Sequence, residues 1–159
     1  MSSAMKTPLS QRGFTLAQML VVMGILAVLT AIAYPSYVNY VKNGRLNDAQ
    51  RALIINAQNL EQHRNKHHSY KKNSTTWADL SLNATSHFCI KMQGNARGAN
   101  DDKFTIKAVA FNKNHEPRVL SINQDHMLMI CENSESSCDT RDAVFKNTGR
   151  SDTNCRIIN

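Results

Sequence analysis

Basic side chains in the second half of the chain have the clearest potential for binding chemistry. They recur through short apolar stretches, the loops between them and the C-terminal tail: Lys91, Arg97, Lys103, Lys107, Arg118, Lys146 and Arg150. Ammonium and guanidinium groups bind phosphates. A formal net charge of +7 also favours anionic partners such as nucleic acid or phospholipid headgroups. We expect Lys91, Lys107 and Arg118 to form a basic stripe; a merely solvated basic surface is the alternative.

Recognition of a nucleotide sequence would need contacts to bases as well as to phosphates. Arg97 lies in GNARGAND, a glycine-rich loop from which its side chain could reach a base edge. Gln93, Asn95 and Asn100 could add amide contacts there. The sequence has no helix-turn-helix, zinc-finger or RNP motif. Any such recognition would therefore use a surface of another kind.

Four cysteines lie in the second half of the chain: Cys89, Cys131, Cys138 and Cys155. They form no C-x-x-C pair, and no cysteine and histidine spacing fits a zinc motif. In an exported chain, two disulfides are expected. Four cysteines allow three pairings, and their spacing alone leaves all three open.

Metal and catalytic chemistry have little support. His63 and His67 have the i, i+4 spacing of helical metal pairs, but no third ligand is evident, so solvated histidines are expected. The acidic cluster NDD, residues 100–102, is too small for a calcium site. No nucleophile lies beside a base. We therefore expect no metal, no cofactor and no enzymatic activity.

An uncharged apolar run at residues 14–41 precedes these residues. As a helix it could span a hydrocarbon core of about 30 Å. Lys6 and Arg12 precede it, which would keep the N-terminus in the cytoplasm. A cleaved secretory signal is the alternative, because AVLTAIA offers small residues for cleavage.

The remaining pattern predicts an α+β fold. Apolar residues recur at spacings of three or four as far as Leu60, which predicts one helix from about Phe14 to about Arg64. The stretch HRNKHHSYKKNSTTWADL is interpreted as helix end and loop. Strands are expected at 87–93, 103–111, 118–124 and 127–131. Their short connections favour an antiparallel meander with the helix packed on it.

The stretch RGFTLAQMLVVMGILAVLTAIAYPSY resembles the N-terminal signature of type IV pilins and pseudopilins. The resemblance implies that a prepilin peptidase cuts between Gly13 and Phe14, that Phe14 is methylated, and that the helix stays in the mature protein. The helix would anchor the subunit in the inner membrane and then pack against other pilin subunits in the filament core. Subunits would therefore occur in the inner membrane, the periplasm and the pilus at the cell surface.

The resemblance also implies a division of the chain and a fold. Residues 1–13 would be the leader, 14–41 the transmembrane and filament-core half of the helix, and 42–159 the globular head. The expected fold is the type IV pilin fold: a long N-terminal helix on a four-stranded antiparallel sheet, with a disulfide-stapled C-terminal region.

Gln18 departs from the family pattern. Pilins usually have Glu at the fifth mature position, where it is thought to pair with the N-terminal amine of a neighbouring subunit. Gln can accept a hydrogen bond from that ammonium but cannot neutralise it. We therefore expect inefficient assembly, as suits a minor subunit; a neutral substitution is the alternative.

Pilins commonly bridge the last strand to the C-terminal region. By that resemblance Cys131 pairs with Cys155, which leaves Cys89–Cys138. The other candidate is Cys89–Cys131 with Cys138–Cys155. A meander disfavours it, because its first and fourth strands lie farther apart than the Cα limit of about 7 Å for a disulfide.

The stretch FCIKMQGNARGANDDKFTIKAVA, with MICENSESSC downstream, resembles the competence minor pilins of neisserial bacteria. That family binds double-stranded DNA for uptake in natural transformation, through an electropositive stripe. Carried over, the resemblance implicates Lys91, Arg97, Lys103 and Lys107. Ser121 departs from it, because the family tends to have a basic residue there; either Arg118 substitutes or the stripe is weaker.

Two other functions remain open. A structural minor pilin could modulate assembly, aggregation or adhesion without touching DNA. A type II secretion pseudopilin shares the N-terminal helix, although its head often binds calcium.

Overall fold

The computed structural model describes residues 13–138 and 152–158, so the leader expected at 1–13 lies almost wholly outside the described residues. The chain divides into two compact units, Met1–Tyr40 and Val41–Asn159. One helix, α1 (Leu16–His67), continues from the first unit into the second. It begins two residues later and ends three residues later than the sequence predicted.

In the first unit α1 is an isolated apolar helix. It contains Gly24 and Pro35 without interruption. Its large apolar side chains from Leu16 to Tyr40 are almost all exposed. By length and composition the helix can cross a membrane. A helix with apolar side chains on every side needs lipid or other apolar helices around it.

A reciprocal cap begins α1. The backbone N–H of Thr15 donates to Oε1 of Gln18 at 3.0 Å, and the backbone N–H of Gln18 donates to Oγ1 of Thr15 at 3.3 Å. This is a capping box, which satisfies two of the backbone donors that a helix leaves without partners. Gln18 therefore has a local structural role as the third residue of the helix.

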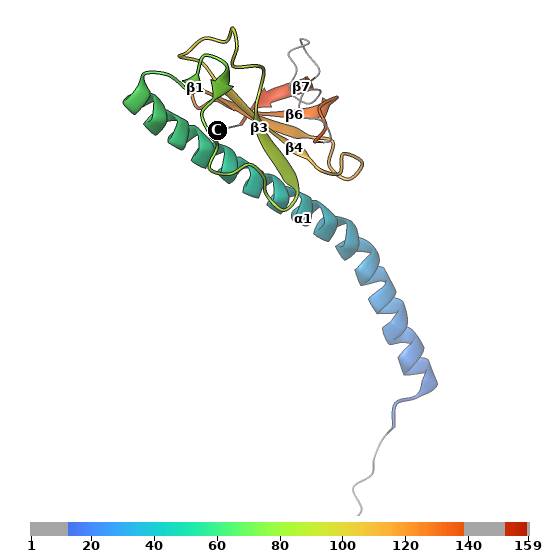
Figure 1. Ribbon diagram of the computed structural model, residues 1–159. Helices are drawn as coiled ribbons and strands as arrows, with labels where there is room; N and C mark the ends of the chain where they lie inside the picture. The colour runs from blue at the N-terminus through green and yellow to red at the C-terminus, as the bar shows by residue number, and fades with distance from the viewer. Residues whose placement is uncertain (1–12, 139–151, 159) are drawn as a thin grey trace, which may run out of the picture. The chain divides into compact units, whose positions relative to one another are not determined.

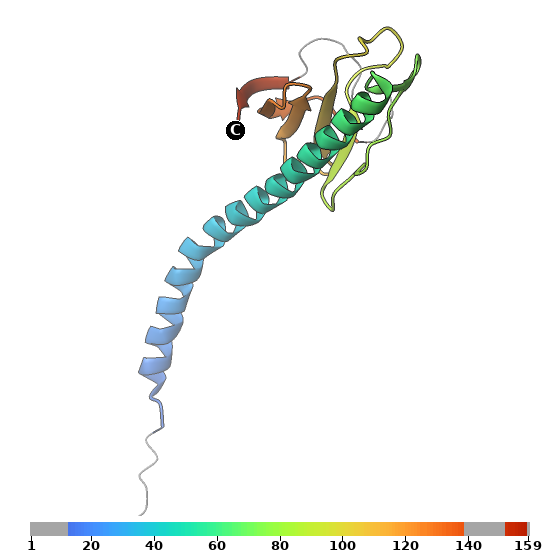
Figure 2. The same cartoon turned by 90° about the vertical axis from the view of Figure 1, so that its left-hand side faces the viewer.

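In the head, α1 lies along one face of an antiparallel sheet (Figures 1 and 2). Its buried residues recur at helical spacing, and many are small, which lets the helix approach the strands closely: Leu46, Ala49, Ala52, Leu53, Asn56, Ala57 and Leu60. The described residues that are buried all lie between Leu46 and Ser136. All the buried residues that the structure describes thus belong to the second unit, Val41–Asn159.

The sheet has five strands in the order β3-β4-β5-β6-β7. Their bounds are β3 Phe88–Met92, β4 Thr105–Ala110, β5 Val119–Asn123, β6 Leu128–Ser134 and β7 Asp152–Ile157. The first four confirm the predicted meander. The prediction of a four-stranded sheet is corrected by β7, which pairs with β6 in the tail.

Strand register separates two faces. Phe88, Ile90, Ile106 and Leu120 belong to the core under α1. The alternate positions form a smaller cluster on the outer face: Cys89, Val109, Val119, Cys131 and partly buried Cys138. Side chains of successive strand residues point to opposite faces, so the outer row beside this cluster contains Lys91, Lys107 and Ser121, which are aligned in register.

Two disulfides tie the tail to the sheet. Cys89–Cys138 links β3 to the segment after β6, and Cys131–Cys155 joins directly opposed residues of β6 and β7. Their Cα atoms are 6.0 and 4.0 Å apart. This is the pairing implied by the pilin resemblance.

A small hairpin, β1 (Lys71–Asn73) with β2 (Thr76–Trp77), follows α1 where the sequence suggested only a loop. Its neighbour is the loop between β3 and β4. The backbone N–H of Tyr70 donates to the carbonyl oxygen of Asp101 at 3.0 Å, and Nε1 of Trp77 donates to the carbonyl oxygen of Gly94 at 3.2 Å. The hairpin and the loop are therefore joined at one end of the sheet.

Candidate nucleic-acid interface

The basic residues singled out from sequence fall into three groups. Lys91, Arg97 and Lys103 form no ion pair with any described residue. Lys107 and Arg118 are engaged in ion pairs. Lys146 and Arg150 lie outside the described residues.

Lys91 lies on the outer face at an edge of the sheet. It is directly opposite Lys107 in the pairing of β3 with β4, and its side chain is half-buried. Phe88, Cys89 and Ile90 before it are fully buried, so the strand is firmly held. Lys91 is therefore presented from a rigid element.

Arg97 and Lys103 are exposed in the loop between β3 and β4. Gly94 and Gly98 have φ angles of 79° and 80°, a region that glycine adopts without strain. Oδ1 of Asn95 accepts a hydrogen bond from the backbone N–H of Arg97 at 3.0 Å. The loop thus has defined local structure, and the Arg97 guanidinium is presented to solvent.

Lys107 is 2% exposed, and its Nζ lies 2.6 Å from Oδ2 of Asp152 and 2.7 Å from Oγ of Ser136. An ammonium enclosed in this way cannot reach a DNA phosphate. The expectation that Lys107 contacts DNA is therefore replaced by an internal role. Strand alternation correctly indicated its face but could not reveal a partner 45 residues away in the sequence.

Arg118 is likewise occupied. Its Nε and Nη2 donate to the two carboxylate oxygens of Glu116 at 2.6 and 2.7 Å, and Glu116 is 7% exposed. These hydrogen bonds raise the pKa of Arg118. Ser121 is buried beside Lys107. The Arg118 guanidinium is thus paired with Glu116 while part of its side chain stays exposed.

Sequence reasoning missed Lys71 and Lys72 in the hairpin. Nζ of Lys71 donates to the carbonyl oxygen of Ala99 and forms an ion pair with Asp101 at 2.9 Å; its side chain is 8% exposed. Lys71 thus helps to join the hairpin to the loop. Lys72 forms an exposed ion pair with Asp79, the kind that contributes little to stability and can exchange for a phosphate. The adjacent lysines of the stretch YKKN are the feature of the sequence that could have identified Lys71 and Lys72 as candidate basic residues.

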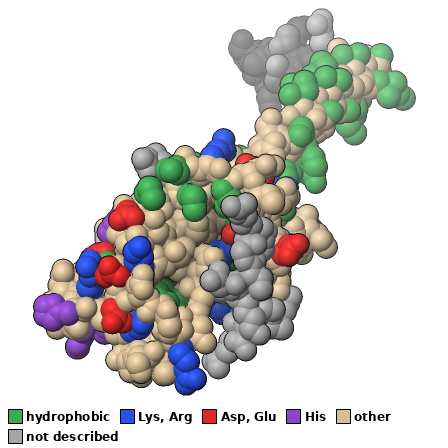
Figure 3. All heavy atoms as spheres, turned by 90° about the horizontal axis from the view of Figure 1, so that it is seen from above, with side chains coloured by type: hydrophobic (Ala, Val, Ile, Leu, Met, Phe, Trp, Pro, Cys, Tyr) green, Lys and Arg blue, Asp and Glu red, His purple; other side chains and the backbone are tan. Residues whose placement is uncertain are grey.

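The joined hairpin and loop border two open recesses. One, of about 830 Å³, is lined by the end of α1, the hairpin and the loop, and includes His63, His67 and Lys72. The other, of about 420 Å³, is lined by the loop, including Arg97, and shares Gly98 and Ala99 with the first. At this end of the head, histidine, lysine and arginine side chains lie among aspartate and glutamate side chains (Figure 3).

His63 and His67 stack with ring centroids 4.4 Å apart, and Nε2 of His63 lies 3.1 Å from the carbonyl oxygen of Lys71. Within the part of the chain that the structure describes, no group of three or more His, Cys, Asp or Glu side chains could hold a metal ion. The pair packs the end of the helix against the hairpin.

We call Lys72, Lys91, Arg97 and Lys103 the basic surface. All four belong to the hairpin, to the β3–β4 loop or to the end of β3 that leads into it. Asp102 is exposed in the same loop and would oppose an approaching phosphate. The arrangement suits an extended polyanion better than a small enclosed ligand.

The residues of the expected processing site precede α1. Gly13 and Phe14 are both exposed, and Phe14 immediately precedes the Thr15 and Gln18 cap. The scissile peptide expected between them is therefore accessible next to the end of the helix.

Residues 35–118 match the family described as type IV minor pilin ComP, DNA uptake sequence receptor. The match covers more than half of the chain. The chain belongs to this family. Residues 9–34 also match the prokaryotic N-terminal methylation motif. This minor pilin therefore has a role in DNA uptake. It is anchored in the inner membrane by its apolar helix before it is assembled with other pilins into the surface pilus.

Two solved structures show similarity over most of their length. The solution structure of the minor DNA-uptake pilin ComP from Neisseria subflava is 36% identical, covers 72% of this chain and 95% of its own, and has a TM-score of 0.57. The type IV pilin ComP from Neisseria meningitidis is 32% identical over 73% of this chain and 99% of its own, with a TM-score of 0.47.

Among curated proteins, prepilin peptidase-dependent protein D of Escherichia coli K12 is 46% identical over 44 residues. That match spans 28% of this chain and 30% of the relative. The name of that relative states that it depends on a prepilin peptidase.

Proposed function

We propose that the head of this minor pilin binds double-stranded DNA through the basic surface, for uptake in natural transformation. The observation that carries the proposal is the joining of the hairpin to the β3–β4 loop. Lys71 contacts Asp101, and Trp77 contacts Gly94, so the hairpin and the loop are held together. These two elements carry Lys72, Arg97 and Lys103, whose side chains are exposed to solvent.

Phosphate contacts would supply most of the affinity. If Lys72, Lys91, Arg97 and Lys103 each neutralise one phosphate, log K falls against log salt with a slope of about −3.6. Lys146 and Arg150 would steepen it if they take part. Arg97 is the candidate for reading a base, because a guanidinium can donate two hydrogen bonds to guanine.

The test is binding of the head, residues 42–159, to duplex DNA from about 50 to about 200 mM salt. We expect Arg97→Ala to weaken binding and to make the slope shallower by about 0.9. Asp102→Asn should tighten binding, because it removes an opposing charge. Arg51→Ala is the matched control: Arg51 is exposed on α1, away from the basic surface, and its loss should change affinity little.

Failure of the head to bind duplex DNA at low salt would favour the second candidate, a structural minor pilin that modulates assembly, aggregation or adhesion. The observation in its favour is Gln18, since a subunit that joins filaments poorly can act at low copy number. Deletion of the chain should then alter pilus number or bacterial aggregation while leaving DNA binding by the cells unchanged.

We also propose that the peptidase cuts between Gly13 and Phe14, which makes 1–13 the leader, 14–41 the membrane half of the helix and 42–159 the head. N-terminal sequencing of the mature protein tests this, and any first residue other than methylated Phe14 contradicts it.

A further inference from the structure

Another recess, of about 280 Å³, lies at the end of the head opposite the basic surface. It is lined by Arg45 of α1, by His87 just before β3, and by Phe111 and His115 in the loop after β4. The start of β3 pairs with the end of β4 at this recess, whereas the β3–β4 loop joins their other ends. The recess is therefore separate from the surface proposed to bind DNA.

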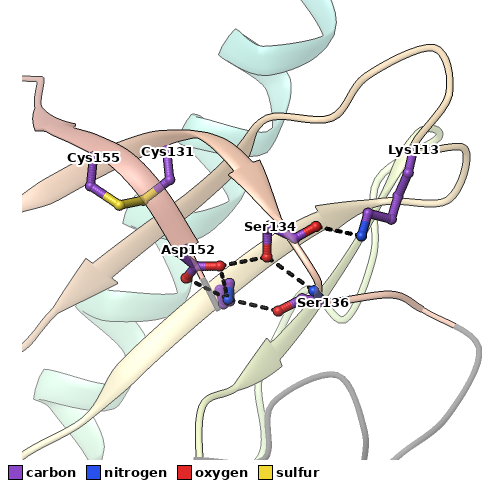
Figure 4. Close-up of polar contacts among 7 residues, drawn as sticks. Lys113, Cys131, Ser134, Ser136, Asp152 and Cys155 are labelled. Carbon is purple, nitrogen blue, oxygen red and sulfur yellow. Dashed lines mark hydrogen bonds and ion pairs between the residues drawn. A yellow bond between two sulfur atoms is a disulfide. The ribbon is translucent and has the colours of Figure 1, made fainter. Parts of the chain in front are cut away.

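The loop after β4 presents Phe111 from a firmly held backbone. The backbone N–H of Phe111 donates to the carbonyl oxygen of His87 at 3.0 Å. Two residues further on, Nζ of Lys113 donates to the carbonyl oxygen of Ser134 (Figure 4). The Phe111 side chain is nevertheless 55% exposed. The fold thus holds a large apolar ring in solvent instead of burying it.

The charge around the recess is basic. Arg45 is half-buried and forms no ion pair with any described residue. His87 and His115 are exposed beside it. The carboxylate that lines the recess belongs to Glu116, which is already paired with Arg118. An unpaired guanidinium near an exposed aromatic ring is a combination typical of surfaces that bind anionic membranes.

Arg45 also lies at the right distance from the membrane, because α1 runs unbroken from the apolar segment that anchors the subunit. At 1.5 Å per residue, the helix rises about 44 Å from Leu16 to Arg45, or about 41 Å if it is tilted by about 20°. A bilayer with its headgroup regions is about 40–45 Å thick. Tyr34, Tyr37 and Tyr40 are exposed just before Arg45, and tyrosine is enriched at membrane interfaces. Arg45 is therefore at the depth of the periplasmic headgroups.

We propose that this recess binds the headgroup of an anionic phospholipid in the periplasmic leaflet of the inner membrane before the subunit enters a pilus. The Arg45 guanidinium binds the lipid phosphate, His87 and His115 line the site, and the Phe111 ring packs against the lipid. The contact leaves the basic surface, at the other end of the head, free. It does not depend on DNA binding. A neighbouring pilin in the filament is the competing occupant.

The experiment uses the full chain in nanodiscs of phosphatidylglycerol and phosphatidylcholine, with one subunit in each disc. Hydrogen exchange of the backbone amides of residues 111–116 reports whether the recess is covered. We expect slower exchange in the discs than in micelles of an uncharged detergent. Arg45→Gln should reduce that protection about fivefold, the effect expected of one basic side chain at an anionic surface. In micelles, Arg45→Gln and the unchanged chain should exchange alike.

Arg51→Gln is the matched control. Arg51 is exposed six residues further along α1 and does not line the recess, so its loss should leave the protection unchanged. Phe111→Ser is a second variant, which tests the apolar contact without altering α1. It should lower the protection of His87 and His115 in the discs. Inorganic phosphate added to the micelles should protect none of these amides, because it offers no apolar surface to Phe111.

Equal exchange in discs and micelles overturns the proposal. Equal losses of protection in Arg45→Gln and Arg51→Gln also overturn it, because they would show a general effect of charge on α1. Protection by inorganic phosphate as strong as that in the discs would identify a site for free anions instead. Protection that appears only in assembled pili would identify a neighbouring pilin as the occupant.

Discussion

Thr15 and Gln18 form a reciprocal cap at the start of α1, and the backbone nitrogen of Thr15 lies 3.0 Å from Oε1 of Gln18. A Glu side chain at this position could make the same bond. The cap therefore does not explain why Gln replaces the Glu that pilins usually have. The difference lies in charge, because only Glu can neutralise the N-terminal ammonium of a neighbouring subunit.

We predict that Gln18→Glu raises the amount of this subunit in purified pili. The substitution keeps the cap and adds the charge that assembly uses elsewhere in the family. Quantitative immunoblotting of pili against total cell protein measures it. Thr15→Ala is the control, since it weakens the cap without changing charge and should not raise incorporation. An unchanged amount for Gln18→Glu would mean that the amide is a neutral substitution.

Asn56 fastens the loop before β3 to the helix. Its side chain is fully buried, donates to the carbonyl oxygen of Leu82 at 2.7 Å and accepts from the Leu82 N–H at 2.9 Å. Asn56→Ala should lower the free energy of unfolding by about 1–2 kcal/mol, because both backbone groups lose their partner. Urea unfolding of the head measures this loss.

The control is the neighbouring exposed bond from Asn59 to Ser81. Asn59→Ala should change stability by no more than about 0.5 kcal/mol, since water replaces that partner. Equal losses in the two variants would contradict the role assigned to burial at Asn56.

Much of the head could be predicted from sequence because its main elements carry local patterns. The four strands from Phe88 to Ser134 alternate or are apolar, and the buried residues of α1 recur at helical spacing. The strand Asp152–Ile157 carries no such pattern, since its side chains after Asp152 are exposed. It is held by β6, a disulfide and Lys107, which are all contacts distant in sequence.

The same limit applies to the candidate site. Arg97 and Lys103 could be identified from the sequence because they lie in an exposed loop, where basic side chains stay accessible to solvent. Lys107 and Arg118 look the same in the sequence, but Lys107 is buried beside Asp152, and the partly exposed Arg118 is paired with Glu116. The β1–β2 hairpin escaped prediction because strands of three and two residues are too short to show alternation.

Tyr70 should make the head less stable at alkaline pH. Burial, followed by its hydrogen bond to Glu61, raises the pKa of the phenol above its ordinary value of 10.0. A group whose pKa is raised in the folded state contributes stability below its unfolded pKa, and that contribution is lost as the pH rises through the folded pKa. The free energy of unfolding should therefore fall above about pH 10.

Tyr70→Phe tests this, because phenylalanine keeps the edge-to-face contact with Phe104 but cannot ionise. The variant should be less stable by about 1 kcal/mol at neutral pH, through the lost hydrogen bonds, and should lose less stability on alkaline titration. Tyr70 is the only tyrosine in residues 41–159, so absorbance of the tyrosinate also reports its titration directly. Parallel alkaline losses in the two proteins would contradict the assignment.

Trp77 should matter for DNA binding although it carries no charge. Its Nε1 donates to the carbonyl oxygen of Gly94, and this bond helps to join the hairpin with Lys72 to the loop with Arg97. Trp77→Phe keeps an aromatic ring and removes the donor, so it should cost about 1 kcal/mol of stability and weaken DNA binding. Duplex titration and amide exchange of the hairpin measure the two effects.

Asp79→Asn is the informative comparison for Trp77→Phe. It breaks the exposed Lys72–Asp79 ion pair, changing stability by at most about 1 kcal/mol, and leaves the Lys72 ammonium free for phosphate. We expect Asp79→Asn to tighten DNA binding while Trp77→Phe weakens it. If both variants bind as the unchanged head does, the hairpin lies outside the DNA interface, and Arg97 and Lys103 act without it.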